Sequence, residues 1–88
     1  SAHPDDILHY NVNLDGRQMT LTYTLDADGT VNILIADVMG LVYRRDSRTT
    51  KAGETATASF DCSGLRSGKY ILYINVNGII HSEKVTLR

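Results

Sequence analysis

The sequence has few of the residues that mark several common classes of protein. It has one cysteine, Cys62, so no internal disulfide can form. It has no tryptophan and one phenylalanine, and its formal net charge is −1. A chain so close to neutral lacks the basic face that neutralises nucleic-acid phosphates, so we expect no nucleic-acid partner. No apolar run approaches the roughly 20 residues of a membrane-spanning helix, so we expect no membrane insertion.

The N-terminal segment also lacks a feature, because it has neither the basic nor the apolar region of a signal peptide. We interpret residues 1–88 as one domain with residues 1–6 as a flexible lead-in, and we place any signal peptide outside this chain. Cys62 has no base or cation beside it in sequence that would stabilise a thiolate. We therefore expect Cys62 to be a small buried hydrophobic residue.

Most of the chain alternates apolar and polar residues, which is typical of β-strands with one buried face. No stretch has helical spacing over a useful length. Asp15-Gly16 and Asn77-Gly78 predict tight hairpins of type I′, and the polar stretch 49–54 predicts a loop. The predicted strands cover residues 8–14, 18–25, 31–36, 41–45, 55–60, 70–76 and 79–87, with 55–60 as a modest edge strand.

The last predicted strand has a fault in its alternation. Val85 and Leu87 share a phase with Glu83, whereas Ile80 lies in the opposite phase. Burying Ile80 and Val85 together requires one extra residue between them, which predicts a β-bulge near Ser82 or Glu83.

One stretch near the sixth strand predicts the architecture. In immunoglobulin-like sandwiches, a tyrosine at the start of strand F donates its hydroxyl to the preceding loop. Here Leu65 can fill the core, Gly68 can take the tight turn and Tyr70 can supply the hydroxyl, so these three residues form a structural corner. Together with seven short strands, this corner predicts an all-β, seven-stranded immunoglobulin-like β-sandwich.

Candidate metal sites are weak. The three histidines match no ligand spacing, although His3, His9 and His81 could in principle join acidic residues of the N-terminal segment. Asp26 and Asp28 lack the bidentate glutamate that completes a calcium loop, so we interpret them as turn carboxylates that accept backbone hydrogen bonds. The sequence predicts no metal and no cofactor.

Candidate catalytic residues are equally weak. Ser63, Ser67 and Ser82 lack the Gly-x-Ser-x-Gly context of a nucleophile elbow. The basic run 44–48 has its arginines on both sides of a strand, which favours a charged sheet edge that blocks strand pairing. We therefore expect no enzymatic activity and no catalytic residue.

Apolar residues also occur in the outward phase of strands that the immunoglobulin arrangement makes neighbours. Leu34, Ile71 and Tyr73 are predicted to form one outward patch, which Tyr43 can join from the next strand. Contiguous exposed apolar residues usually mark a contact surface. The patch is thus either an interaction surface, for a protein partner or self-association, or a face covered by a loop or by the N-terminal segment.

Several motifs together resemble a known family. The order of an Asp-x-x-Gly turn followed by Ser-Gly-Leu-x-Ser-Gly-x-Tyr is similar to the C-terminal sorting domains of the Bacteroidetes type IX (Por) secretion system. It also resembles the immunoglobulin-like domain of flagellar hook-cap proteins and small secreted Bacteroides proteins of unknown function. The resemblance covers about residues 17–88 and is carried by residues 21–25, 31–42, 63–70 and 84–85. None of these families implies catalytic residues.

The sequence therefore predicts a non-catalytic accessory module of a secreted or cell-surface bacterial protein, periplasmic or associated with the outer membrane. It acts by protein contacts, and the resemblance gives a secretion sorting domain as its most specific form. A carbohydrate-binding module, a small free-standing secreted protein and an inert spacer remain as alternatives. A glycan ligand has little support, because few exposed aromatic residues are expected.

Overall fold

The computed structural model describes residues 7–88, so the predicted lead-in at residues 1–6 lies outside the described residues. Among the described residues no helix long and apolar enough to cross a membrane is found. The secondary structure of this part is made of seven strands. They are β1 (Leu8–Asp15), β2 (Gln18–Leu25), β3 (Gly29–Asp37), β4 (Val42–Thr50), β5 (Ala56–Asp61), β6 (Gly68–Val76) and β7 (Ile79–Leu87).

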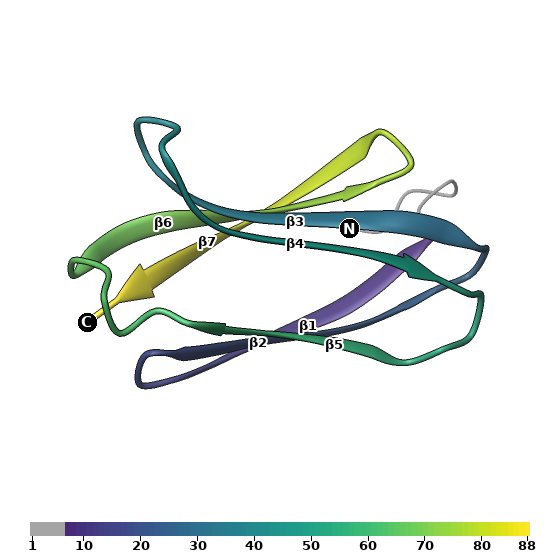
Figure 1. The fold of residues 1–88 in the computed structure, drawn as a ribbon, viewed down its shortest axis with the longest axis horizontal. Helices are drawn as coiled ribbons and strands as arrows, with labels where there is room; N and C mark the ends of the chain where they lie inside the picture. The colour runs from purple at the N-terminus through teal and green to yellow at the C-terminus, as the bar shows by residue number, and fades with distance from the viewer. Residues whose placement is uncertain (1–6) are drawn as a thin grey trace.

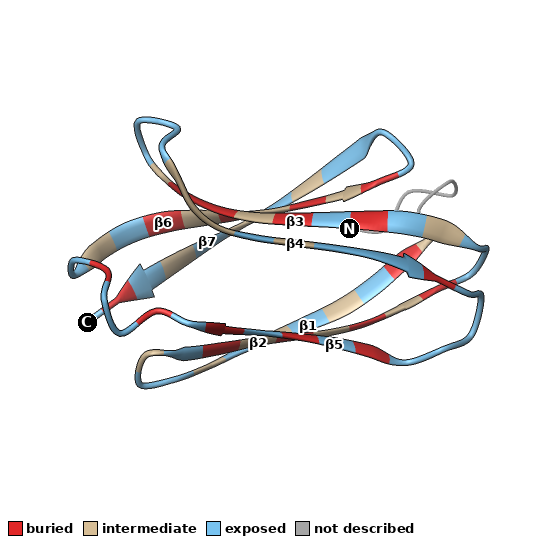
Figure 2. Ribbon diagram, in the orientation of Figure 1, coloured by how far each residue is buried: buried red, intermediate tan, exposed pale blue. Residues whose placement is uncertain are grey.

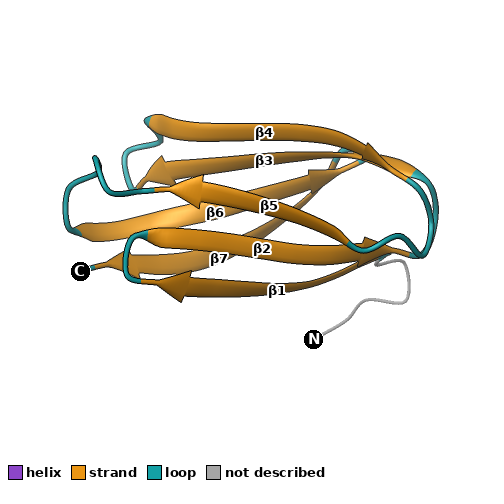
Figure 3. Ribbon diagram, turned by 60° about the horizontal axis from the view of Figure 1, so that its bottom comes forward, coloured by secondary structure: helices purple, strands orange, loops and turns teal. Residues whose placement is uncertain are grey.

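The strands form two antiparallel sheets that pack face to face (Figures 1 and 3). One sheet has three strands in the order β1-β2-β5, and the other has four in the order β4-β3-β6-β7. Strands β3 and β6 are neighbours, as strands C and F are in immunoglobulin-like domains. The structure therefore confirms the predicted seven-stranded immunoglobulin-like sandwich.

The core lies between the sheets and is built from every second residue of the strands, which Figure 2 shows as alternating buried and exposed bands. This alternation follows from the pleat of a strand, whose successive side chains point to opposite faces. Cys62 is fully buried as predicted, and Tyr23 and Thr50 place a hydroxyl pair 3.4 Å apart inside the core. The largest fully buried side chains are those of Met19, Leu21, Tyr23, Leu25, Ile33, Ile35, Leu72, Ile74 and Leu87.

The two predicted hairpin turns differ in type. Asn77 and Gly78 both have positive φ, at 51° and 89°, which is the type I′ pattern predicted for them. The β1–β2 turn has Gly16 and Arg17 as its central residues, since Asp15 pairs with Gln18. Only Gly16, with φ 59°, is positive there. The prediction of type I′ is wrong for this turn, which has the φ pattern of type II′ with glycine at the first central position.

Strand β4 is longer than predicted. It continues from Val42 to Thr50, so the predicted loop over residues 49–54 begins two residues later. The charged residues of this segment obscured its strand character in the sequence. They are compatible with a strand here because β4 lies at the edge of its sheet, where side chains reach water. Strand β5 is also an edge strand, as expected.

The predicted bulge in the last strand is absent. The register between β6 and β7 is continuous from Gly68 opposite Leu87 to Val76 opposite Ile79. No extra residue is needed, because Ile80 is not buried but 63% exposed on the outer face. The irregularity lies instead between β3 and β4 at Ile35 and Ala36. Ala36, which alternation with the inward Ile33 and Ile35 would place on the outer face, is buried at this point.

Candidate interaction surface

The outer faces of the two sheets differ in chemistry. On the three-stranded sheet, the outward positions carry small polar residues, as in the paired row Asn11, Thr22 and Thr57. On the four-stranded sheet, Leu34 of β3 lies directly opposite Tyr73 of β6. Large apolar side chains therefore lie in the middle of one outer face. We call it the four-stranded outer face, made of Asn32, Leu34, Arg45, Lys69, Ile71, Tyr73, Asn75, Ile80, Ser82, Lys84 and Thr86.

The sheet register brings three of the predicted patch residues together. Leu34 and Tyr73 form one cross-strand pair, and Ile71 lies two residues from Tyr73 on the same side of β6. All three side chains are half-buried. Neighbouring strands of a sheet lie about 4.8 Å apart, so these side chains form a continuous apolar surface.

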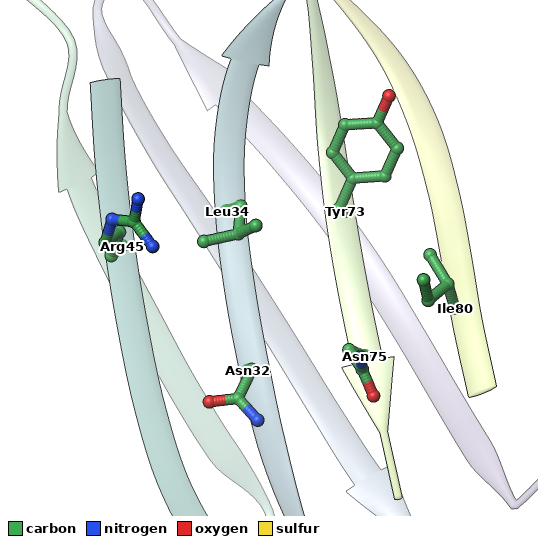
Figure 4. A pocket seen from close by; sticks show the side chains of 6 residues that line it. All are labelled: Asn32, Leu34, Arg45, Tyr73, Asn75 and Ile80. Carbon is green, nitrogen blue, oxygen red and sulfur yellow. The ribbon is translucent and has the colours of Figure 1, made fainter. Parts of the chain in front are cut away.

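This face is hollowed. A depression of about 460 Å³ lies over its centre, with Leu34 and Tyr73 between Arg45 on β4 and Ile80 on β7 (Figure 4). The side-chain amides of Asn32 and Asn75 complete its lining. A second depression of about 260 Å³ lies where the face meets the β3–β4 hairpin. Its lining comprises Val38, Lys69, Tyr70, Ile71, Lys84, Val85 and Thr86.

The exposed large apolar side chains of residues 7–88 all belong to two hairpins of the four-stranded sheet. Val38, Met39 and Leu41 in the β3–β4 hairpin are 67%, 88% and 61% exposed. Ile79 and Ile80 in the β6–β7 hairpin are 51% and 63% exposed. The two hairpins lie at opposite ends of the sheet and rise away from the three-stranded layer (Figure 1). Val38 and Ile80 add apolar area at the two ends of the four-stranded outer face, whereas Ile79 pairs with the buried Val76 and lies in the inward phase of β7.

Asp37 organises the β3–β4 hairpin. Its Oδ1 accepts hydrogen bonds from the amides of Met39 and Leu41, each at 2.9 Å. Its Oδ2 accepts one from the Tyr43 hydroxyl at 2.9 Å. The amide of Leu41, with the Tyr43 hydroxyl and the amides of Met39 and Gly40, holds the pKa of the Asp37 carboxyl below its ordinary value. The apolar residues of the hairpin are thus presented by a turn with a fixed backbone.

Tyr43 does not join the outer patch. Its ring packs edge-on against Tyr70, with the ring centroids 5.7 Å apart, and it contacts the core. The hydrogen bond to Asp37 raises the pKa of Tyr43, and burial raises it further. The cause is the irregular register, which makes Tyr43 the extra residue of β4 between Val42 and Arg44. Alternation alone does not reveal such a change of phase.

The structural corner has the expected residues in contact. The Tyr70 hydroxyl donates to the carbonyl oxygen of Arg66 at 2.7 Å, four residues earlier, as in a tyrosine corner. The Leu65 side chain lies in the core. Gly68 has φ 148°, a conformation that residues with a Cβ rarely adopt.

Arg17 is a structural residue that the sequence analysis missed. From the β1–β2 turn, its guanidinium donates to the carbonyls of Cys62 and Leu65 at 3.1 and 2.6 Å. It also donates to the carbonyl of Arg88 at 2.9 Å and to Ser67 Oγ at 3.1 Å. Arg17 therefore joins three separate segments at one end of the sandwich. Only its position after a turn glycine is visible in the sequence, and that position does not identify its distant partners.

The remaining candidate residues are dispersed. His9 pairs with Asp26 at 2.9 Å in an exposed position, and Asp28 accepts the Ala52 amide at 2.8 Å. His3 lies outside the described residues, and His81 lies on β7 opposite Ile74. Within residues 7–88 no group of three or more metal-ligating side chains is found.

The arginines and the cysteine have ordinary structural surroundings. Arg44 donates to the carbonyl of Asp61 at 3.1 Å, which joins β4 to β5 across the side of the sandwich. Arg45 points to the opposite side, onto the four-stranded outer face. Burial raises the pKa of the Cys62 thiol, which disfavours the reactive thiolate.

Comparison with known structures agrees with the fold. The chain is similar to the crystal structure of a hypothetical protein from Pyrococcus horikoshii OT3, with a TM-score of 0.51 and 12% sequence identity. The alignment covers 94% of this chain and 88% of that one. At this identity the likeness shows the fold alone. No curated protein matches the chain.

Comparison with protein families identifies the module. Residues 12–88 match the model of the secretion system C-terminal sorting domain. The match includes the Asp-x-x-Gly turn, the Tyr70 corner and the last strand, and it confirms the resemblance to Por sorting domains predicted from these motifs. Such a domain is part of a secreted or cell-surface protein. The chain belongs to the family of secretion system C-terminal sorting domains.

Proposed function

We propose that this domain directs its carrier protein through the secretion system by binding a protein component with the four-stranded outer face. The main support is that the exposed apolar side chains are concentrated around the four-stranded outer face. All five large ones of residues 7–88 lie on the two hairpins that bound this face, and Leu34, Ile71 and Tyr73 lie between them. Contiguous apolar area on so small a domain is costly to leave in water, so it favours a contact.

The chemistry of the surface fits binding rather than catalysis. Its centre is apolar, and its polar groups are amides, hydroxyls and cations held on rigid strands. Rigid backbone lowers the entropy that is lost on association. The Asp37 turn extends this advantage to Met39, the most exposed of the large apolar residues, because its loop is already ordered before a partner arrives.

Export of a reporter protein tests this proposal. The reporter is fused upstream of residues 1–88 and expressed in a bacterium that has the secretion system. We expect Tyr73→Lys and Leu34→Lys to abolish export, because each places a charge in the apolar centre of the face. The matched control is Thr22→Lys, which places the same charge in a half-buried position on the other outer face.

The stability of each variant must be measured beside its export. We expect melting curves of the purified domains to stay close to that of the wild type, because outward substitutions leave the core intact. Full export of the folded Tyr73→Lys and Leu34→Lys variants would contradict the proposal. Equal loss of export in the Thr22→Lys variant would show that the effect is not specific to this face.

A carbohydrate-binding role has one observation in its favour. The central depression combines the Tyr73 ring with the amides of Asn32 and Asn75, and an apolar surface with a few polar groups is typical of small-ligand sites. Tyr43, the other tyrosine predicted to lie on this outer face, packs against Tyr70 instead. Titration of the domain with soluble oligosaccharides tests this role. Saturable NMR shifts at Tyr73, Asn32 and Asn75 would support it, and unchanged spectra would exclude it for the sugars used.

A further inference from the structure

The four-stranded outer face carries charge of one sign only. Arg45 lies beside the central depression, and Lys69 and Lys84 line the second one. Among residues 7–88, no aspartate or glutamate lines either depression. The ion pair found within residues 7–88 joins His9 to Asp26, so the three cations have no ionic partner in this part of the chain. A face with an apolar centre and a cationic rim is complementary to an apolar surface that carries carboxylates.

This charge pattern selects among possible occupants. Two copies of the domain placed face to face would bring like charges together, which opposes self-association through this face. A flat membrane surface would contact the raised hairpins before it reached Leu34 and Tyr73 (Figure 1). A narrow protein segment can enter the depression between the hairpins and reach both the apolar centre and the cations.

The dimensions of the face suit an extended segment. The central depression crosses the sheet from Arg45 on β4 to Ile80 on β7 (Figure 4). Three gaps of about 4.8 Å separate these strands, which gives a width of about 14 Å. About four residues of extended chain, at roughly 3.3 Å each, span that width. The amides of Asn32 and Asn75 can hydrogen-bond the backbone of such a segment.

We propose that the four-stranded outer face binds an extended, acidic segment of a partner protein, whose apolar side chains lie over Leu34 and Tyr73 and whose carboxylates pair with Arg45 and Lys84. This inference rests on the proposed function, from which it takes the role of this face in export. It adds the chemistry of the partner, which the family assignment does not supply.

Binding of synthetic peptides to the 88-residue chain tests the partner chemistry. The probe is a capped, fluorescent peptide of three Asp-Leu repeats, and the matched probes contain Ser-Leu and Lys-Leu repeats. We expect saturable binding of the acidic probe alone, with NMR shifts confined to Leu34, Tyr73 and their neighbours. The affinity should fall as ionic strength rises, because exposed charge pairs are screened by salt.

Charge reversal supplies the second arm. We expect the double variant Arg45→Glu/Lys84→Glu to weaken binding of the acidic probe by at least about tenfold, which corresponds to about 1.4 kcal/mol. The control Lys51→Glu reverses one positive charge, half the change of the double variant, in an exposed loop away from the face and should leave binding unchanged. Equal binding of the three peptides, or equal loss with Lys51→Glu, would overturn the proposal.

Two further measurements decide between the other occupants. A wild-type dimer in sedimentation that Tyr73→Lys converts to a monomer would overturn the proposal in favour of a second copy. Binding to anionic phosphatidylglycerol vesicles without binding of the acidic peptide would overturn it in favour of a membrane surface. A wild-type monomer that binds the acidic peptide but not these vesicles would support it.

Export of the same variants separates this inference from the proposed function. Loss of export with both Tyr73→Lys and the double charge reversal supports both. Loss with Tyr73→Lys alone means that the face is used but its partner is not acidic. If neither variant loses export, the proposed function fails, whatever the peptide measurements show.

Discussion

The Tyr70 hydroxyl joins the start of β6 to the loop that precedes it. It donates to the Arg66 carbonyl at 2.7 Å, and the Tyr70 side chain is 5% exposed. Tyr70→Phe removes the donor and leaves that carbonyl without it, so we expect a loss of about 1–3 kcal/mol in the free energy of unfolding. Urea unfolding measures the loss. The control is Tyr73→Phe, whose hydroxyl lies on the outer face, and a Tyr70→Phe midpoint equal to wild type would contradict the prediction.

Gly68 of this corner and Gly64 just before it separate the effect of backbone conformation from that of packing. Gly68 and Gly64 both have open space where a Cβ would lie, but only Gly68 has a positive φ, at 148°. We expect Gly68→Ala to lower the stability by about 1–3 kcal/mol, because alanine is strained in this region. Gly64→Ala should be neutral or slightly stabilising, because it only restricts the unfolded chain. Thermal unfolding compares the two, and equal melting temperatures would refute the argument.

At the scale of an element, the β3–β4 hairpin depends on one carboxylate. Asp37→Ala removes the acceptor of three hydrogen bonds and should lower the stability of the domain. Asp37→Asn keeps one acceptor oxygen, so we expect its stability to lie between those of Asp37→Ala and wild type. Hydrogen bonds lower the pKa of Asp37 in the folded state. Its contribution is therefore complete above the ordinary carboxyl pKa and is lost as the pH falls through the lowered one.

Unfolding of wild type and Asp37→Asn at several pH values checks this dependence. We expect the difference in stability between them to be constant near neutral pH and to shrink below about pH 4. A difference that persists unchanged in acid would mean that the charge of Asp37 plays no part. Hydrogen exchange at the amides of Met39 and Leu41 should be faster in Asp37→Ala, because both lose their acceptor.

The edge strands β1 and β7 are joined across the side of the sandwich. The Tyr10 hydroxyl donates to the Glu83 carboxylate at 2.7 Å, and this hydrogen bond, with burial and the nearby negative charge, raises the pKa of Tyr10 to about 12. We expect Tyr10→Phe to cost about 1 kcal/mol at neutral pH, because the bond is charged but partly exposed. A midpoint within error of wild type at pH 7 would contradict this.

The raised pKa also predicts a pH dependence in alkali. Tyrosines of the unfolded chain ionise near pH 10, whereas Tyr10 in the fold stays protonated up to about pH 12. The contribution of Tyr10 is therefore present below pH 10 and is lost between about pH 10 and 12. Over this interval, wild type should lose more stability than Tyr10→Phe. Parallel denaturant titrations of both proteins measure the difference.

The strands also show where sequence patterns lose their power. Alternation predicted β1, β2, β3 and β6 well, because one face of each is buried and the other is not. In β7 it led to a false bulge, since Ile80 was assumed to need burial. An isoleucine can lie on either face of a strand, so residue type alone cannot show whether Ile80 points into the core or to the outer face. The register with β6 assigns it.

For the whole molecule, the arrangement of strands was predictable and the shape of the surface was not. The neighbourhood of β3 and β6 follows from the immunoglobulin-like order, so the sequence placed Leu34, Ile71 and Tyr73 together. It placed Tyr43 wrongly, because one irregular pair shifts the phase of β4. Whether Ile80 and Arg45 line the outer face depends on the register of β7 and β4 with their neighbours. The shape of the two depressions depends on side chains from several strands at once.

Adjacent residues of β6 test whether the two sides of this sheet are independent. Ile71 is half-buried on the outer face, whereas Leu72 is fully buried in the core. We expect Ile71→Lys to change the free energy of unfolding by less than about 1 kcal/mol, because its ammonium group can reach water. Leu72→Lys places the same charge between the sheets and should cost more than about 4 kcal/mol, a large part of the stability of a domain this size.

Circular dichroism and thermal unfolding of the two purified variants give the comparison. A folded Ile71→Lys domain that melts near wild type, beside an unfolded Leu72→Lys chain, is the expected result. It would show that the apolar outer face is free to serve binding, since the fold does not need it. An Ile71→Lys domain as unstable as Leu72→Lys would mean that the outer face is part of the core. The proposed docking surface and the proposed acidic partner would then both lose their support.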